Sequence, residues 1–222
     1  MTTTIERPED FAAMRIAMVA SQLRPNAVSD PRVVAAMADV PRERFVPEAQ
    51  ASVAYRDALL PLGQGRTANL PIATGRLLTE ARLQPGDRVL LIGAASGYTA
   101  AVLARLVAHV VAVEVDPALA GVAQRTLAGE HRVTVIEGPL ERGHAADGPY
   151  DVLVIDGAVE AIPSTLVTQV VPGGRIVGGL IERGVTRLAA GRRSEGGFAM
   201  IDFADIDCAI LPGFAAPPKF TF

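Results

Sequence analysis

The chain has 222 residues, of which 50% are hydrophobic, and this is enough apolar material for the core of one large domain. Its 21 basic and 24 acidic residues give a net charge of −3, which excludes the strongly basic surface of a nonspecific nucleic-acid binder. The single cysteine, Cys208, excludes an internal disulfide or a thiolate metal cluster and indicates a reducing compartment. Residues 1–10 lack the apolar core of a signal peptide, and residues 100–115, the most apolar run, contain Arg105 and His109 and are too short to span a membrane. These features predict a soluble, cytoplasmic protein with no membrane segment.

Residues 1–85 are predicted to form helices joined by loops. Apolar residues at helical spacing predict a first helix over 11–23. The Asp-Pro pair at 30–31 predicts the start of a second helix, because Asp caps helices well and Pro fits their first turn. Residues 61–71 are rich in Pro and Gly and are expected to be a loop long enough to carry function, and a third helix is expected over 71–83. We expect this segment to cover the ligand cleft of the domain that follows.

Residues 86–222 change to an alternation of short apolar runs and helical segments, which predicts an α/β doubly wound, mostly parallel sheet. The predicted strands are residues 89–92, 110–115, 133–137, 152–155 and 175–177. Helices are expected over 98–107 and 118–128. Residues 186–190 and 198–206 flank a Gly-rich stretch and predict a β-hairpin. The first and fourth predicted strands should be adjacent, with the topological switch point of the sheet between them.

The turn after the first predicted strand is glycine-rich, with Gly93 and Gly97 at its ends and Ser96 between them. In an open parallel sheet, ligands bind beyond the carboxyl ends of the strands, where backbone N–H groups can contact them. Glu114 ends the second predicted strand about twenty residues later, where a carboxylate can accept hydrogen bonds from a ribose diol. A glycine pair alone is more often only a turn, but turn and acid together predict a nucleoside-ligand site.

Five stretches of the chain match one known family. They are MVASQL at 18–23, VPRERFVPE at 40–48, AYRDALLPLGQG at 54–65, LLIGAASGYTAAVLA at 90–104 and YDVLVIDGAVEAIPSTLVTQVVPGGRIV at 150–177. On these stretches the chain resembles the protein-L-isoaspartate O-methyltransferases, and VPRERFVPE is the most specific because ordinary methyltransferases lack it. The resemblance implies a Rossmann-like class I methyltransferase fold with seven strands, the last of them formed by the hairpin. It also implies S-adenosylmethionine as cofactor and isoaspartyl carboxylates of damaged proteins as substrate.

The resemblance implies site residues as well. Those expected around S-adenosylmethionine are Gly93, Ala95, Ser96, Gly97, Glu114 and Pro139, and those expected around the substrate carboxylate are Thr67 and Asn69. Several of them depart from the family pattern: Thr-Ile-Ser-Gln-Pro reads TANLP at 67–71, so Asn69 replaces the active-site serine. Leu91 replaces an acid of the glycine-rich motif and Ala95 replaces its middle glycine. Pro139 replaces the aspartate that contacts the adenine amino group.

These replacements predict weaker cofactor binding. The acid missing at Leu91 and the acceptor missing at Pro139 correspond to hydrogen bonds worth together roughly 2.5–4 kcal/mol, or two to three decades of affinity. Ala95 adds a Cβ atom where the backbone must approach the ligand closely. We therefore expect isoaspartyl methyltransferase activity that is weak or absent in the chain as it stands.

Two other functions stay open on the sequence: a non-catalytic relative that keeps the fold as a binding module, and a methyltransferase with a different substrate. Asp156 follows the fourth predicted strand, like the metal aspartate of catechol-type methyltransferases. No later Asp-Asn pair accompanies it, so a polar residue at the mouth of the cleft is favoured and no metal site is predicted. Cys208 is expected to be a packed residue near the last strand. The sequence leaves the oligomeric state open.

Overall fold

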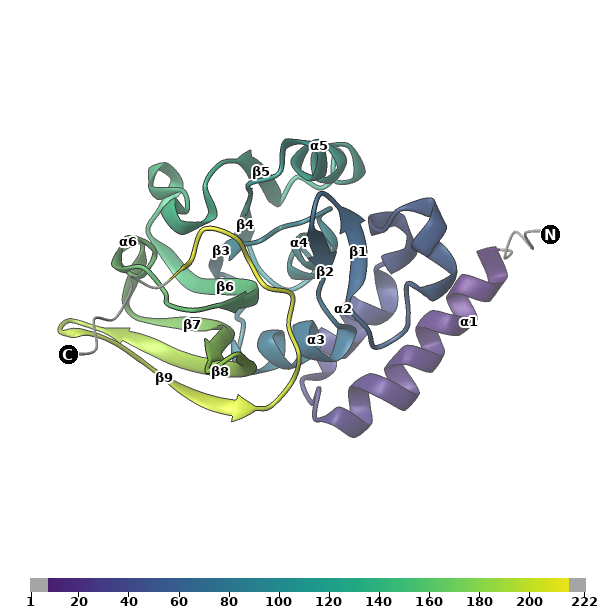
Figure 1. Cartoon of the computed structure of the whole chain (residues 1–222), viewed down its shortest axis with the longest axis horizontal. Coiled ribbons are helices and arrows are strands. Elements are labelled where there is room, and N and C mark those ends of the chain that lie inside the picture. Colours follow the sequence, from purple (N-terminus) through teal and green to yellow (C-terminus); the bar gives the residue numbers. More distant parts are fainter. Residues whose placement is uncertain (1–7, 216–222) are drawn as a thin grey trace.

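The computed structural model describes residues 8–215, which form nine strands and six α-helices (Figure 1). The strands are β1 (Leu60–Gly63), β2 (Arg66–Ala68), β3 (Arg88–Ile92), β4 (His109–Glu114), β5 (Val133–Glu137), β6 (Tyr150–Val159), β7 (Val170–Glu182), β8 (Val185–Ser194) and β9 (Gly197–Ala204). The helices are α1 (Pro8–Met18), α2 (Pro31–Asp39), α3 (Pro71–Glu80), α4 (Tyr98–Leu103), α5 (Pro117–Thr126) and α6 (Ser164–Val167). Residues 1–7, part of the polar segment in which no signal peptide was expected, lie outside the described residues.

Seven of the strands form one sheet in the order β5-β4-β3-β6-β7-β8-β9. The strands from β5 to β7 are parallel, and β8 and β9 extend the sheet as an antiparallel hairpin. The first and fourth predicted strands are indeed neighbours, with Val89 in register with Val152. The predicted doubly wound, mostly parallel sheet is therefore confirmed, with the switch point beside β3.

Both faces of the sheet are covered, and this explains the unbroken apolar runs of its central strands. Along β3, Val89 and Leu91 face a core cluster that includes residues of α2, α3 and α4, whereas Leu90 and Ile92 face a second cluster on the other side. Leu211 and Phe214, from the segment after β9, belong to that second cluster. Figure 1 shows this C-terminal segment, in yellow, running back across the sheet.

The N-terminal helices form where the sequence predicts them. Asp30 caps α2 by accepting a hydrogen bond from the backbone N–H of Arg32 at 2.8 Å, and Pro31 occupies the first turn. The helix predicted over 11–23 continues from α1 into a π-helical turn, Val19–Leu23. Met18 and Leu23 are fully buried in the same core cluster as α2 and α3, so this segment packs onto one face of the sheet.

Several predicted boundaries were wrong: β6 and β8 each extend four residues beyond the ends expected at 155 and 190, and α3 ends three residues before 83. Three further differences concern the kind or extent of an element. The loop expected over 61–71 contains the antiparallel β1–β2 hairpin, in which Leu60 pairs with Ala68. The helix expected over 98–107 ends at Leu103. The strand expected over 175–177 is the middle of β7, which runs from Val170 to Glu182 through the Pro-Gly-Gly stretch expected to precede it. Val170 pairs with Tyr150 of β6, and pairing with β8 begins only at Arg175, so the Pro-Gly-Gly stretch lies in an irregularity of register between the two paired parts of the strand.

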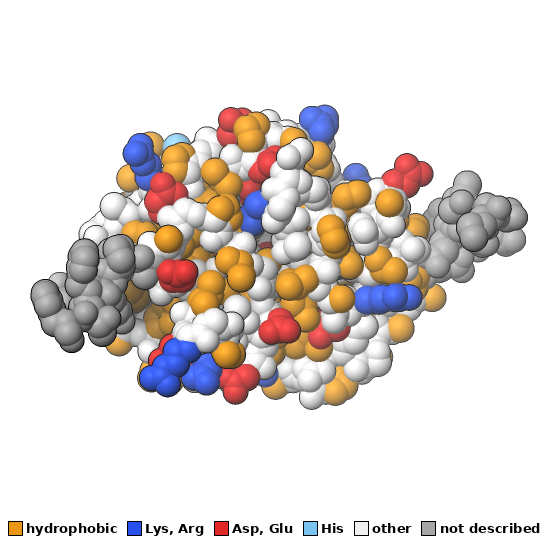
Figure 2. Space-filling view, in the orientation of Figure 1, with side chains coloured by type: hydrophobic (Ala, Val, Ile, Leu, Met, Phe, Trp, Pro, Cys, Tyr) orange, Lys and Arg blue, Asp and Glu red, His pale blue; other side chains and the backbone are white. Residues whose placement is uncertain are grey.

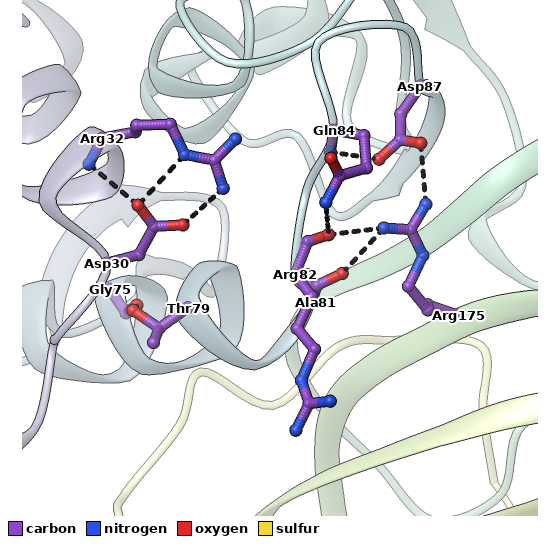
Figure 3. A network of polar contacts seen from close by, with 9 residues as sticks. All are labelled: Asp30, Arg32, Gly75, Thr79, Ala81, Arg82, Gln84, Asp87 and Arg175. Carbon is purple, nitrogen blue, oxygen red and sulfur yellow. Dashed lines mark hydrogen bonds and ion pairs between the residues drawn. The ribbon is translucent and has the colours of Figure 1, made fainter.

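A buried ion pair ties β7 to the loop before β3 (Figure 3). Arg175 donates to Asp87 at 2.7 Å and to the carbonyls of Arg82 at 2.6 Å and Ala81 at 3.3 Å. The other carboxylate oxygen of Asp87 accepts the backbone N–H of Gln84 at 2.7 Å. The network holds the turn that leads into the first strand of the sheet.

Replacing Arg175 with methionine should lower the free energy of unfolding by about 2–3 kcal/mol, because it leaves the nearly buried Asp87 without its cation. Chemical denaturation measures the change. Arg192→Met is the matched control, since Arg192 lies opposite Arg175 on β8 with an exposed side chain and should change stability by less than about 0.5 kcal/mol. Equal denaturation midpoints for the two variants would show that the network contributes nothing.

Charged groups of both signs are spread over the face drawn in Figure 2 and alternate with apolar groups. Neither sign of charge dominates this face, in keeping with the near balance of 21 basic and 24 acidic residues in the chain. Among the described residues, none of the helices combines the length and apolar character that crossing a bilayer requires.

Candidate active site

The turn between β3 and α4 wraps over the end of β4. The backbone N–H groups of Gly93 and Ala94 both donate to the carbonyl of Val113, at 3.1 and 3.0 Å. Gly93 and Gly97 have φ angles of +81° and +101°, a backbone region that glycine adopts without strain. A Cβ at Gly93 would also lie 2.9 Å from the side chain of Leu211. These two glycines are therefore required by the turn, as the sequence predicts.

Ala95 adopts the same left-handed region, with a φ of +49°, although it carries a Cβ. A non-glycine residue pays roughly 1–2 kcal/mol there, so the turn keeps its shape at some cost in stability. Its N–H donates to a carboxylate oxygen of Glu114 at 2.7 Å. This bond fixes the turn against the end of β4.

Glu114 is completely buried, and its two carboxylate oxygens accept five hydrogen bonds. Arg66 of β2 forms a two-pronged ion pair with it, from Nε at 3.1 Å and from a terminal guanidinium nitrogen at 2.8 Å. The backbone N–H groups of Ala95, Val115 and Asp116 supply the other three, at 2.7, 3.1 and 3.1 Å. The acid that the sequence predicts as a ribose acceptor thus has an internal partner from the β1–β2 hairpin.

Asp156, near the carboxyl end of β6, collects three side chains from three other segments. One oxygen accepts from Asn69 Nδ2 at 3.1 Å and from Thr74 Oγ1 at 3.0 Å, and the other accepts a short bond from Thr99. Asn69 is held at its other end too, because its Oδ1 accepts the N–H of Ala209 at 3.2 Å. Through these bonds, Asp156 joins the loop after β2 to α3 and α4. Within residues 8–215 no group of three His, Cys, Asp or Glu side chains could hold a metal ion.

The VPRERFVPE stretch forms a roof over the turn. Arg42 is 2% exposed and donates to the carbonyls of Ala54 at 2.8 Å and Asn69 at 2.6 Å, with its guanidinium 4.7 Å above the ring of Tyr98. Phe45 accepts the hydroxyl of Ser96 at its backbone carbonyl and packs edge-on against Tyr98. Through these contacts with Ser96 and Tyr98, the stretch packs directly against the glycine turn and the start of α4.

Between roof and turn lies a cavity of about 20 Å³, far below the roughly 300–1,000 Å³ of typical ligand pockets. It is lined by Arg42, Phe45, Val46, Thr67, Ala68, Asn69, Gly93, Ala94, Ala95, Ser96, Tyr98, Thr99 and Asp156. A larger hollow of about 710 Å³ opens elsewhere, beside the amino end of β4. Its residues Arg32 and Arg105 are already paired with Asp30, Asp39 and Glu130. The small cavity is the one that lies at the glycine turn.

The structure brings most of the predicted site residues together. The predicted residues that line the small cavity at the glycine turn are Thr67, Asn69, Gly93, Ala95 and Ser96. Gly97 caps α4, Glu114 is bonded to the turn, and Pro139 lies exposed just after β5, next to Gly138, which donates to the Glu114 carbonyl. Their roles toward a ligand stay predictions.

Sequence reasoning missed Arg66 and Arg42. Arg42 lies in the most family-specific stretch, which was a usable signal, whereas Arg66 lies in a hairpin that was expected to be a loop. The contact between Ala209 and Asn69 had no sequence signal, because 140 residues separate them.

The expectation for Cys208 is supported by its environment. The thiol is 3% exposed, and burial, together with the nearby charges of Asp156 and Asp207, raises its pKa to about 12. Because the raised pKa leaves only about one thiolate in ten thousand at pH 8, Ellman's reagent should react very slowly with the native protein and rapidly after unfolding in urea. Raising the pH toward 10 should increase the native rate. Complete reaction of the native thiol within seconds at pH 8 would contradict this assignment.

A doubly wound sheet with a glycine turn after its first strand and an acid at the end of its second has the architecture of the Rossmann-like class I methyltransferases. Two solved structures share it. The first, a protein-L-isoaspartate O-methyltransferase, has a TM-score of 0.78 and 25% identity and covers 90% of this chain, which spans 66% of that one. The second, from Plasmodium falciparum in complex with S-adenosyl-L-homocysteine, has a TM-score of 0.73 at 17% identity, covering 89% and 97%.

The family model for protein-L-isoaspartate(D-aspartate) O-methyltransferase matches residues 14–204. A protein-L-isoaspartate O-methyltransferase 1 of Rhodopseudomonas palustris (strain HaA2) is 43% identical over 169 residues, which are 75% of this chain and 69% of that protein. A protein-L-isoaspartate O-methyltransferase of Gloeobacter violaceus is 43% identical over 162 residues, which are 72% of this chain and 79% of that protein. The chain belongs to the protein-L-isoaspartate(D-aspartate) O-methyltransferase family. The family membership predicted from the motifs is confirmed.

Proposed function

We propose that this protein transfers a methyl group from S-adenosylmethionine to isoaspartyl carboxylates of damaged proteins, in the cytoplasm. The observation that carries the proposal is the meeting of the substrate loop (67–71) and the glycine turn (93–97) around one cavity, under the roof formed by the family-specific stretch. Family membership and the enzyme relatives at 43% identity favour this activity over a pure binding module or another substrate.

The residues present fit this cofactor in part. Gly93 and Gly97 leave room for close backbone approach, and Glu114 lies where an acceptor for a ribose diol belongs. The residue that does not fit is Arg66, which occupies that acceptor. When bound, S-adenosylmethionine supplies a methyl group activated by its sulfonium charge. The chain's own contribution is to hold the substrate carboxylate in line and to exclude water.

The substrate loop divides this work between two residues. The amide of Asn69 is bonded at both ends, to Asp156 and to Ala209, so Asn69 positions the loop. Arg42 fixes the same loop through the Asn69 carbonyl. Thr67 is half-buried and lines the cavity. Because the amide of Asn69 is already bonded, the Thr67 hydroxyl is the polar group of the loop that can contact the substrate carboxylate.

A labelled-methyl assay tests the function. Label should enter a peptide with an isoaspartyl residue and not the same peptide with a normal aspartyl residue. Alkali should release the label as methanol, because the product is a methyl ester.

Thr67→Val should lower the rate of methyl transfer about tenfold, the effect of one lost hydrogen bond. Pro139→Asp should tighten cofactor binding about tenfold by returning an acceptor. No incorporation at a cofactor concentration that saturates binding would instead support the binding module.

Leu91 should not be changed in such tests. Its side chain is fully buried in the core cluster on the α2–α4 side of the sheet. A glutamate there would place an uncompensated charge in an apolar environment and destabilise the fold. A Leu91→Glu variant would therefore report the stability of the fold as well as any cofactor contact that the missing acid would supply.

A further inference from the structure

The ion pair between Arg66 and Glu114 lies inside the candidate cofactor cleft. Glu114 is 0% exposed and Arg66 is 6% exposed, so both charges are withdrawn from water. The third guanidinium nitrogen, Nη1, is buried without a hydrogen-bond partner among the described residues. Such an orphaned donor is costly, and the closed pair is therefore incompletely satisfied.

The carboxylate of Glu114 has no capacity left for a ligand. An ionised carboxylate offers about four acceptor positions, and here five donors share them. The donors at Ala95, Val115 and Asp116 are backbone N–H groups of the turn and of the chain that follows β4. Only the side chain of Arg66 can leave without dismantling the turn and the carboxyl end of β4. Its departure leaves three donors for about four acceptor positions, so one position becomes free for a ribose hydroxyl.

The element that carries Arg66 is suited to move. It is a hairpin of four and three residues that forms its own two-stranded sheet, and isolated two-stranded hairpins are marginally stable. Its turn holds Gly63, Gln64 and Gly65, all with positive φ. With this hairpin in place the cavity measures about 20 Å³, too small for a nucleoside.

We propose that Arg66 is a latch on the nucleoside site: its guanidinium occupies Glu114 in the free protein and gives way to the ribose diol when the cofactor binds. The proposal rests on the proposed function, because it assumes a nucleoside cofactor in this cleft. Binding therefore requires the β1–β2 hairpin to open, which lowers the apparent affinity by the fraction of molecules that are open.

Calorimetric titration with S-adenosylmethionine tests the latch on the full-length chain. Arg66→Met keeps the aliphatic stem without the guanidinium and should tighten binding roughly 10- to 100-fold, as expected if 90–99% of molecules are closed. Arg66→Lys keeps the charge without the two-pronged geometry and should give an intermediate affinity. Arg56→Met is the matched control, since Arg56 is exposed ten residues upstream, and it should bind like the unmodified chain.

Hydrogen exchange on the unmodified chain gives a second readout that does not depend on how the variants fold. Saturating S-adenosylmethionine should speed exchange in residues 60–68, because the latch opens, while slowing it in the turn 93–97. Equal affinity of the unmodified chain and Arg66→Met, or a hairpin that is protected by the ligand, would overturn the latch and leave the proposed function standing. No binding by any of the proteins would overturn both.

Discussion

Glu114→Ala is expected to lower the free energy of unfolding by about 3 kcal/mol, because three backbone N–H groups lose a charged acceptor at roughly 1 kcal/mol each. These donors, at Ala95, Val115 and Asp116, belong to the turn and to the chain after β4, and each donates to the Glu114 carboxylate. The guanidinium of Arg66 adds little to the loss if the hairpin can release it to water. The acid thus stabilises the fold, in addition to the ligand role proposed for it.

The control for this variant is Glu137→Ala. Glu137 is the register neighbour of Glu114 on β5 and is exposed, so its loss should change stability by less than about 0.5 kcal/mol. Denaturation in urea compares the two proteins. If both variants unfold at the same urea concentration, the hydrogen bonds to Glu114 do not support the turn.

Adding Arg66→Met to Glu114→Ala should change the free energy of unfolding little. A large recovery of stability in the double variant would mean that Arg66 cannot leave its site.

Arg42→Met is expected to cost about 3–5 kcal/mol of stability, the largest effect of the variants considered. Its guanidinium is 2% exposed and makes charge-assisted bonds to the carbonyls of Ala54 and Asn69, which would be left without it. The contact with the ring of Tyr98 adds a cation–π term of about 1–2 kcal/mol. Since methionine fills much of the same volume, the loss reports the polar contacts more than packing.

Arg44→Met serves as the comparison for Arg42→Met. Arg44 lies two residues away in the same VPRERFVPE stretch but is exposed, and its replacement should be nearly neutral. Methyl transfer at a temperature where both variants are folded should fall only for Arg42→Met, because Arg42 holds the substrate loop at Asn69. A loss of stability below about 1 kcal/mol for Arg42→Met would show that water replaces both bonds at little cost.

Much of the fold could be predicted because its signals are local. The apolar run at 89–92 becomes β3 almost to the residue, since a strand covered on both faces needs no polar positions. The run at 133–137 becomes β5 with the same bounds, at the edge of the sheet. Gly93 and Gly97 could be assigned to a turn from the sequence, because a positive φ angle depends on the single residue that adopts it. The β1–β2 hairpin could not be predicted, because strands joined by only three residue pairs are too short to show a periodic pattern.

The sequence by itself determined the doubly wound sheet, its glycine turn and the family, because burial periodicity, turn chemistry and motif spacing are all written within short stretches of chain. Only the tertiary structure decided which side chains meet at the site. Glu114 bonds to Arg66 across 48 residues, and Asn69 bonds to Asp156 across 87. A carboxylate withdrawn from water must find donors wherever the fold places them. Since folding brings together segments that share no local pattern, the partner of Glu114, and with it the closed state of the cleft, could be found only in three dimensions.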